Sequence, residues 1–170
     1  MLFRSVLDRS LSSLPDAVAG LQGIRAPLGT FAVLGNHDYY ADRYSYSARY
    51  RGGIRIQQGL DSIGIRTLRN EVVHLESGGE RLALMGLDWL TVSPTDRNFY
   101  SYKPVETRRQ LGRMMQDTEP GTPLVLLAHH PDTFKDTPPE IGLTLSGHTH
   151  GGGQVIFGNE IGRASCRERV

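Results

Sequence analysis

Three short apolar segments of this chain each end in a loop that carries histidine. The segments are predicted strands that end near residues 34, 128 and 145. The loops that follow them read GNHD, HHPD and GHTH, and they hold five of the six histidines. In an open α/β sheet, ligands bind beyond the carboxyl ends of the strands. We therefore expect the three loops to meet and form a binding site.

The segments around these loops predict a layered α/β domain. Apolar residues recur with helical spacing in three segments, which are 10–21, 54–64 and 104–116. Residues 71–77 and 81–86 flank Gly78-Gly79 and predict a β-hairpin, whereas 41–53 and 91–103 are predicted as loops. Helices and strands that mix without strict alternation, in a chain of 170 residues, favour one domain with mixed sheets.

Charge and composition exclude several classes of protein. The net charge is +1, and no nucleic-acid-binding patch is evident. The single cysteine, Cys166, excludes an internal disulfide and any cysteine-rich zinc module. No stretch approaches the roughly 18 consecutive apolar residues of a membrane span. Membrane association would therefore require a segment that precedes residue 1.

The GHTH loop is open to three interpretations. If its backbone is extended, His148 and His150 point to the same side and can share a metal site. The loop is otherwise a structural turn, or an oxyanion loop of the lipase type, given its flanking glycines. The lipase interpretation requires a G-x-S-x-G nucleophile elbow, and the sequence contains none.

The other two loops add donors of the same kind. His129 directly follows a buried strand, and we interpret it as a metal ligand. His130 points the other way if that strand continues, so it is a weaker candidate for a substrate contact. Asn36 offers a carbonyl oxygen suited to divalent cations, and His37 beside Asp38 forms a titratable pair. An Asx-type turn is the structural alternative for this loop.

Taken together, the three loops resemble those of calcineurin-like metallophosphoesterases. The matching motifs are GNHD at 35–38, HHP at 129–131 and GHTH at 147–150, in the order of that family. GNHDYY and SGHTHGG look most like the bacterial, often membrane-associated branch. The resemblance implies a four-layer α-β-β-α sandwich with mixed sheets. It also implies two divalent metal ions (Mn, Fe, Zn or similar) that activate a hydroxide to attack phosphorus.

The same resemblance implies a role for each matching residue. Asn36, His129 and His148 match ligands of the second metal, and His150 matches a ligand of the first. His37 matches the histidine that protonates the leaving oxygen, and Asp38 matches the acid that orients it. Asp88 lies where relatives often carry an acidic loop, and we expect it to act behind the ligands. His130 stays a substrate-binding candidate.

Two departures from the family pattern stand out. No Asp-x-His precedes GNHD, and Arg4-Ser5 stand where Gly-Asp is expected, with only Asp8 matching the trailing acid. The bridging aspartate and two ligands of the first metal are therefore absent from these residues. We expect a partial domain over 1–159, incomplete at its N-terminal side. Residues 160–170 lack apolar periodicity, and we expect a non-native or disordered tail there.

These observations predict a metal-dependent hydrolase of phosphomonoesters or phosphodiesters, acting on a phosphorylated small molecule or lipid. Two other functions stay open. One is an inactive fragment that binds metal without turnover, because the first-metal aspartates are missing. The other is a protein with a single metal held by His129, His148 and His150. Its activity or folding would survive the loss of Asn36, whereas a two-metal site would not.

Overall fold

The computed structural model describes residues 11–40, 46–89, 102–148, 154–157 and 160–163. Its helices are α1 (Leu14–Leu21), α2 (Asn36–Tyr40), α3 (Tyr46–Ser62) and α5 (Pro104–Gln116), with short 3-10 helices η1 (Leu11–Ser13) and η2 (Pro131–Asp136). Its strands are β1 (Thr30–Ala32), β2 (Ile65–Thr67), β3 (Glu71–Ser77), β4 (Glu80–Leu87), β5 (Leu124–Ala128), β6 (Ile141–Ser146), β7 (Gln154–Phe157) and β8 (Glu160–Arg163). In this part of the chain, no helix has the length and apolarity to span a membrane.

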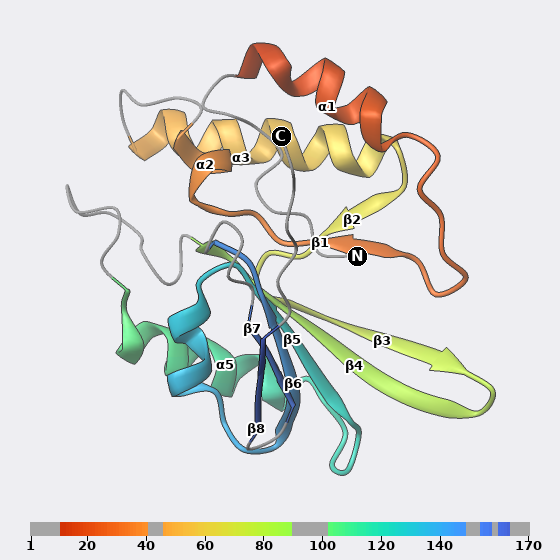
Figure 1. Cartoon of the computed structure of the whole chain (residues 1–170), viewed down its shortest axis with the longest axis vertical. Helices are drawn as coiled ribbons and strands as arrows, with labels where there is room; N and C mark the ends of the chain where they lie inside the picture. Colours follow the sequence, from red (N-terminus) through yellow and green to blue (C-terminus); the bar gives the residue numbers. More distant parts are fainter. Residues whose placement is uncertain (1–10, 41–45, 90–101, 149–153, 158–159, 164–170) are drawn as a thin grey trace.

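The strands form two sheets, and the helices cover their outer faces. β1 and β2 pair in parallel, while β3 to β8 form a six-stranded sheet in sequence order. Within it, β4, β5 and β6 are parallel to one another and the outer pairs are antiparallel. Figure 1 shows α1 and α3 above β1 and β2, with the larger sheet below and α5 on its far side. The α/β fold that the sequence predicted, an α-β-β-α sandwich, is confirmed.

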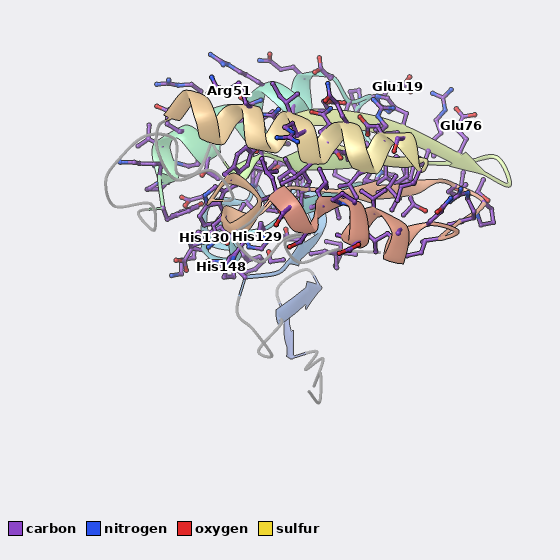
Figure 2. The ribbon with its side chains drawn as sticks, turned by 90° about the horizontal axis from the view of Figure 1, so that it is seen from above. Arg51, Glu76, Glu119, His129, His130 and His148 are labelled. Atoms are coloured by element: carbon purple, nitrogen blue, oxygen red, sulfur yellow. The ribbon has the colours of Figure 1, made fainter. Side chains whose placement is uncertain are left out.

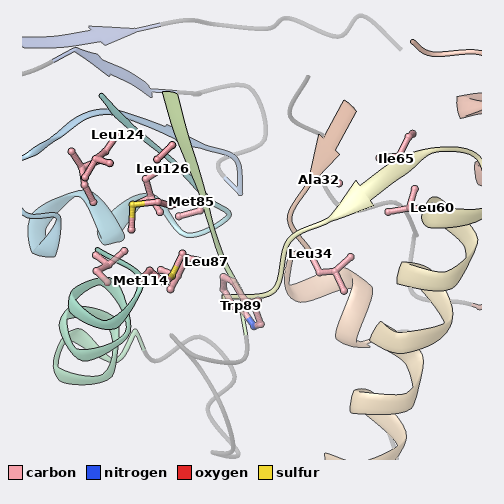
Figure 3. Close-up of a cluster of buried hydrophobic side chains, with 14 of the residues drawn as sticks. Ala32, Leu34, Leu60, Ile65, Met85, Leu87, Trp89, Met114, Leu124 and Leu126 are labelled. Atoms are coloured by element: carbon pink, nitrogen blue, oxygen red, sulfur yellow. The ribbon is translucent and has the colours of Figure 1, made fainter. Parts of the chain in front are cut away.

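Side chains alternate along the strands, so one set packs between the two sheets and the other packs between the sheets and the helices. Val33 and Leu84 belong to a cluster that lies between the two sheets with Leu68 and Leu127. Their neighbours in sequence face the helices. Figure 3 shows two such groups, one where α5 covers the larger sheet and one where α3 covers the smaller sheet. Their labelled members are Met85, Leu87, Met114, Leu124 and Leu126 in the first and Ala32, Leu34, Leu60 and Ile65 in the second.

The connection from β2 to β3 joins the two sheets. The Leu68 N–H donates to Ala32 O in the small sheet at 2.8 Å, and the Asn70 N–H donates to Gly86 O in the large sheet at 2.8 Å. Asn70 has a left-handed backbone (φ 60), which suits asparagine better than most residues. A Cβ at Gly86 would lie 2.1 Å from Leu68 Cβ, so glycine is required where the sheets approach. Their relative position is therefore set by close, directional contacts.

Most of the predicted elements are present, but one segment differs. The hairpin is confirmed, with Gly78 and Gly79 both at positive φ and Ser77 paired with Glu80. The loop predicted over 41–53 is wrong from Tyr46 onward, because α3 begins there and includes Gly52 and Gly53. A Cβ at Gly53 would lie 2.3 Å from the Tyr39 ring, so this glycine lets α3 pack on α2. Residues 41–45 and 90–101 lie outside the described residues.

The C-terminal segment also contributes a strand. Glu160–Arg163 form β8, which pairs antiparallel with β7 from Gln154 to Phe157. This strand covers the first four residues of the segment 160–170, for which the sequence predicts a non-native or disordered tail. Three statements stay predictions: that the domain is incomplete on its N-terminal side, where its limits lie, and that the tail is non-native or disordered.

Candidate metal centre

The centre of the candidate site is a contact between Asn36 and His129. The Asn36 side-chain oxygen lies 3.1 Å from His129 Nε2, and the two residues are 2% and 3% exposed. Asn36 is the first residue of α2, after β1, whereas His129 follows the last residue of β5. The two side chains therefore come from different sheets and are 93 positions apart in sequence. The expectation that these loops meet holds for this pair.

Glycine makes room for the His129 ring. A Cβ at Gly35 would lie 2.5 Å from His129 Cε1, well inside van der Waals contact. A Cβ at Gly147 would lie 3.3 Å from His129 Nδ1, which is also close. The glycines before Asn36 and His148 thus allow both backbones to approach one imidazole. Their role is close approach, because neither has a positive φ.

His148 lies beside His129 but in an unexpected conformation. The two ring centroids are 5.2 Å apart. β6 ends at Ser146, and His148 has a left-handed backbone with φ 71. The extended backbone that would align His148 with His150 is therefore wrong at His148. A left-handed non-glycine residue costs free energy, and such residues are enriched at functional sites. His150 lies outside the described residues.

His130 also belongs to this cluster. β5 ends at Ala128, so the alternation that would turn His130 away does not continue. The ring stacks on Trp89 with centroids 5.4 Å apart and on His148 at 5.3 Å. Its Nδ1 accepts a hydrogen bond from the Asp132 backbone N–H at 3.2 Å and caps η2. In the neutral ring the proton is therefore on Nε2. Burial, followed by the charge of His148, lowers the pKa of His130.

Trp89 connects the three histidines, and the sequence did not single it out as a site residue. Its indole ring packs against His129, His130 and His148 at centroid distances of 5.5, 5.4 and 5.3 Å. Trp89 is 1% exposed and directly follows Asp88 at the end of β4. Figure 2 shows the three histidines together at one side of the molecule. A large aromatic residue two positions beyond the end of a buried strand was the available signal.

Asp38 is buried and braces the loop that carries Asn36. Its carboxylate accepts a hydrogen bond from the Gly35 backbone N–H at 2.8 Å, and the Asp38 N–H donates to Gly35 O at 3.2 Å. His37 lies between Asn36 and Asp38 on the same short helix and is partly exposed. This bond runs from Asp38 back to the residue three before it, as in a capping box, so it is not the Asx-type turn that was the structural alternative.

Asp88 directly precedes Trp89 and contacts residues outside the histidine cluster. It accepts hydrogen bonds from the Tyr39 hydroxyl at 2.5 Å and from Arg69 Nε at 2.9 Å. Asp88 is buried and Arg69 nearly so. Its expected role behind the ligands stays a prediction.

The chemistry of these donors fits part of a divalent metal site. Donor atoms about 2.1 Å from one ion and about 90° apart are separated by about 3 Å. The separation of 3.1 Å between the Asn36 oxygen and His129 Nε2 fits such a pair as well as a hydrogen bond. Within the described ranges, no group of three His, Cys, Asp or Glu side chains is placed to hold a metal ion. Asn36, His129 and His148 supply neutral donors only.

Comparisons with known proteins agree with the motifs. The family model described as calcineurin-like phosphoesterase matches residues 6–152. A transmembrane protein with metallophosphoesterase domain from Bos taurus is 32% identical over 151 residues, which cover 85% of this chain and 31% of that protein. An uncharacterized metallophosphoesterase of Aquifex aeolicus is 29% identical over 154 residues, covering 89% and 49%. One from Helicobacter pylori is 28% identical over 149 residues, covering 86% and 34%.

The chain spans about a third to a half of the length of these relatives. No solved structure matches it significantly.

Proposed function

The chain belongs to the calcineurin-like phosphoesterase family, and on that premise we propose that it is a metal-dependent phosphohydrolase of phosphomonoesters or phosphodiesters. The observation that carries the proposal is the buried contact of the Asn36 amide oxygen with His129 Nε2 at 3.1 Å. The two donors follow strands of different sheets, so their contact does not result from a local turn. Members of the family generally use divalent metal ions.

In this proposal, each candidate residue has a role that fits the atoms it offers. Asn36, His129 and His148 would hold one ion, and His150 would contribute to a second. Two such ions, when bound, clamp the phosphate and lower the pKa of an attacking water. His37 would hold the proton that passes to the leaving oxygen. Asp38 would keep the loop in place, supported by its hydrogen bond from the Gly35 N–H.

His130 would contact the substrate in this scheme. Its Nδ1 is engaged by the Asp132 N–H, so Nε2 carries the proton and can donate to a phosphate oxygen. The lowered pKa of His130 keeps the ring neutral near neutral pH. A neutral donor recognises a phosphate through hydrogen bonding and adds no charge. His130 would therefore position the substrate.

The proposed substrate is a phosphorylated small molecule or lipid. The near-neutral charge of the chain gives no general attraction for nucleic acid. The bovine relative is named a transmembrane protein, so a lipid presented in a membrane is one of the two substrates to test. The comparison of a water-soluble phosphate ester with a phospholipid presented in vesicles separates the two substrates.

The test begins with metal binding by the 170-residue chain. We expect Mn²⁺ binding in calorimetry that weakens at least about tenfold in His129→Ala and His148→Ala, because each removes a donor. His74→Ala is the matched control, since His74 lies on β3 and contacts Asp117 O instead. Equal Mn²⁺ affinity in all four proteins would remove the basis of the proposal.

Turnover is the second part of the test. With Mn²⁺ and bis-nitrophenyl phosphate we expect slow hydrolysis, because Asp-x-His and Gly-Asp are absent from these residues. Fast turnover that disappears in His148→Ala would show that the aspartates are dispensable. Metal binding without any turnover would favour the inactive metal-binding fragment.

The Asn36→Ala variant tests the alternative in which the protein holds a single metal ion. It uses His129, His148 and His150, so Asn36→Ala would leave metal affinity and any activity near the wild-type values. The contact of Asn36 with His129 favours the opposite result. We expect Asn36→Ala to weaken Mn²⁺ binding by about tenfold or more.

A further inference from the structure

Asp88 is the centre of a buried polar network beside the candidate site. Its Oδ1 accepts from the Tyr39 hydroxyl at 2.5 Å, and its Oδ2 accepts from Arg69 Nε at 2.9 Å. Its backbone N–H donates to the Asn70 side-chain oxygen at 3.0 Å. Arg69 also lies over the Tyr39 ring, with Cζ 5.8 Å from the centroid. Both carboxylate oxygens are thus engaged, in surroundings nearly closed to water.

The network joins the three segments on which the site depends. Tyr39 belongs to α2, the helix that begins with Asn36 and contains His37. Arg69 lies in the connection between β2 and β3, whose neighbouring N–H groups bond to each sheet. Asp88 immediately precedes Trp89, whose ring packs on His129, His130 and His148.

We propose that Asp88 is a positioning residue that, through Tyr39 and Arg69, fixes the Asn36–His37 half of the site relative to the histidines of the large sheet. The inference rests on the proposed function, because it gives that site its alignment. Asp88 itself is not placed among the reacting groups.

The physical argument concerns the interface between the sheets. Apolar contacts there hold the sheets together but are non-directional, so they resist sliding weakly. Charge-assisted hydrogen bonds have defined lengths and angles. The Asp88 carboxylate receives one such bond from each of two segments, α2 and the β2–β3 connection. It therefore adds two side-chain hydrogen bonds of defined direction to the backbone hydrogen bonds of Leu68 and Asn70.

Tyr39 is suited to this role because it stays neutral. Burial, followed by the negative charge of Asp88, raises the pKa of Tyr39 well above its usual value. The hydroxyl therefore remains a donor over the whole working range of pH. Its ring also lies against Gly53 of α3, so the side chain is held on two sides.

The experiment uses Trp89 as an internal probe, because it is the single tryptophan of the chain. Acrylamide quenching in metal-free protein reports whether the end of β4 stays closed. Quenching of Trp89 emission by added Mn²⁺ reports metal binding beside it. Both are measured well below the melting temperature on folded protein, as judged by circular dichroism.

Tyr39→Phe removes one hydroxyl and keeps the ring, and Asp88→Asn keeps the size of the side chain. We expect easier acrylamide quenching in both variants and an Mn²⁺ midpoint raised about tenfold or more. Asp61→Asn is the matched control. Asp61 also accepts a hydrogen bond near this connection, from Thr67 N at 3.2 Å, but it belongs to α3 and this bond involves neither Tyr39 nor Arg69.

The outcomes separate this inference from the proposed function. If wild-type emission does not respond to Mn²⁺, the metal-based function is contradicted, while acrylamide quenching still decides whether Asp88 positions this region. If Tyr39→Phe is folded and matches wild type in both readouts, the inference is wrong, whatever its melting temperature. If Asp88→Asn does not fold, Tyr39→Phe alone decides.

Discussion

At the scale of single residues, the site depends on unusually close packing around imidazoles. His129 is approached by the backbone of Gly35, by Trp89 and by His148. His148 adopts a left-handed backbone to reach this position. Such packing leaves little room for any side chain to shift, so small substitutions should have large effects on metal binding.

Gly35→Ala tests this close packing. The new Cβ would lie 2.5 Å from His129 Cε1, so the ring or the Gly35 backbone must move, which disturbs the contact with Asn36. We expect a loss of about 1–3 kcal/mol in the free energy of unfolding and Mn²⁺ affinity at least about tenfold weaker. Denaturant unfolding and calorimetry measure the two effects. Gly142→Ala, where a Cβ meets only Leu124 O at 3.9 Å, should lower neither; a matching loss there would contradict the steric explanation.

His130 makes a pH-dependent contribution to stability. Burial lowers its pKa in the folded protein below the ordinary value of 6.5, so the folded state binds this proton less readily than the unfolded chain. The contribution is therefore present above about pH 6.5 and is lost as pH falls through the lowered folded-state pKa. We expect the melting temperature to fall from pH 7.5 toward pH 5.

His130→Asn provides the comparison for this pH effect. Asparagine keeps an acceptor for the Asp132 N–H at the start of η2 but does not titrate. Its melting temperature should therefore vary less between pH 7.5 and 5. Equal slopes for the variant and the wild type would assign the pH effect to other groups.

At the scale of elements, α3 shows how packing overrides local preference. Its first half contains Gly52 and Gly53, which favour a loop when read locally. The helix forms because it buries its own Ile56 and Leu60 in the core. The Tyr39 ring packs against it at Gly53. The glycine is thus required by the neighbouring helix, although it weakens its own.

Gly53→Ala and Gly112→Ala test this distinction. Both replace glycine inside a helix, where alanine is intrinsically favoured by about 1 kcal/mol. At Gly112, nothing lies within 4 Å of the new Cβ, so we expect a gain of about 0.5–1 kcal/mol in unfolding free energy. At Gly53, the Tyr39 ring lies at 2.3 Å, so we expect a loss of about 1–3 kcal/mol. Urea unfolding decides, and a gain in both variants would show that the contact relaxes freely.

At the scale of the whole molecule, the site lies across two sheets. β1 leads to Asn36 from the small sheet, and β5 and β6 lead to His129 and His148 from the large sheet. An ion held by these donors would therefore cross-link two layers that unfolding separates.

Metal binding should accordingly stabilise the folded chain. Mn²⁺ at a hundred times its dissociation constant should add about 2.7 kcal/mol to the free energy of unfolding. A rise in melting temperature that EDTA reverses would measure this effect. The rise should vanish in His129→Ala and persist in His74→Ala. A full shift in His129→Ala would show that the ion binds elsewhere.

Local pattern predicted much of this architecture. Helical spacing over 104–116 corresponds to α5, and the Gly78-Gly79 pair to the turn between β3 and β4. The segment 46–53 was predicted wrongly, because the requirement for glycine there comes from Tyr39 on another helix. His130 was given a minor role because strand alternation was assumed to continue beyond Ala128. The local sequence alone does not mark Trp89 as a site residue, and only its three ring contacts connect it to the site.

The sequence by itself determined which side chains follow the strands: Asn36, His129 and His148 stand beside glycine or at strand ends, and these signals are local. Only the tertiary structure decided that Asn36 and His129 come from different sheets and still lie 3.1 Å apart. It also decided that Asp88 joins Tyr39 to Arg69. The reason is physical. Periodicity and turn chemistry act over a few residues, whereas contacts between distant residues depend on strand pairing and on how two sheets pack.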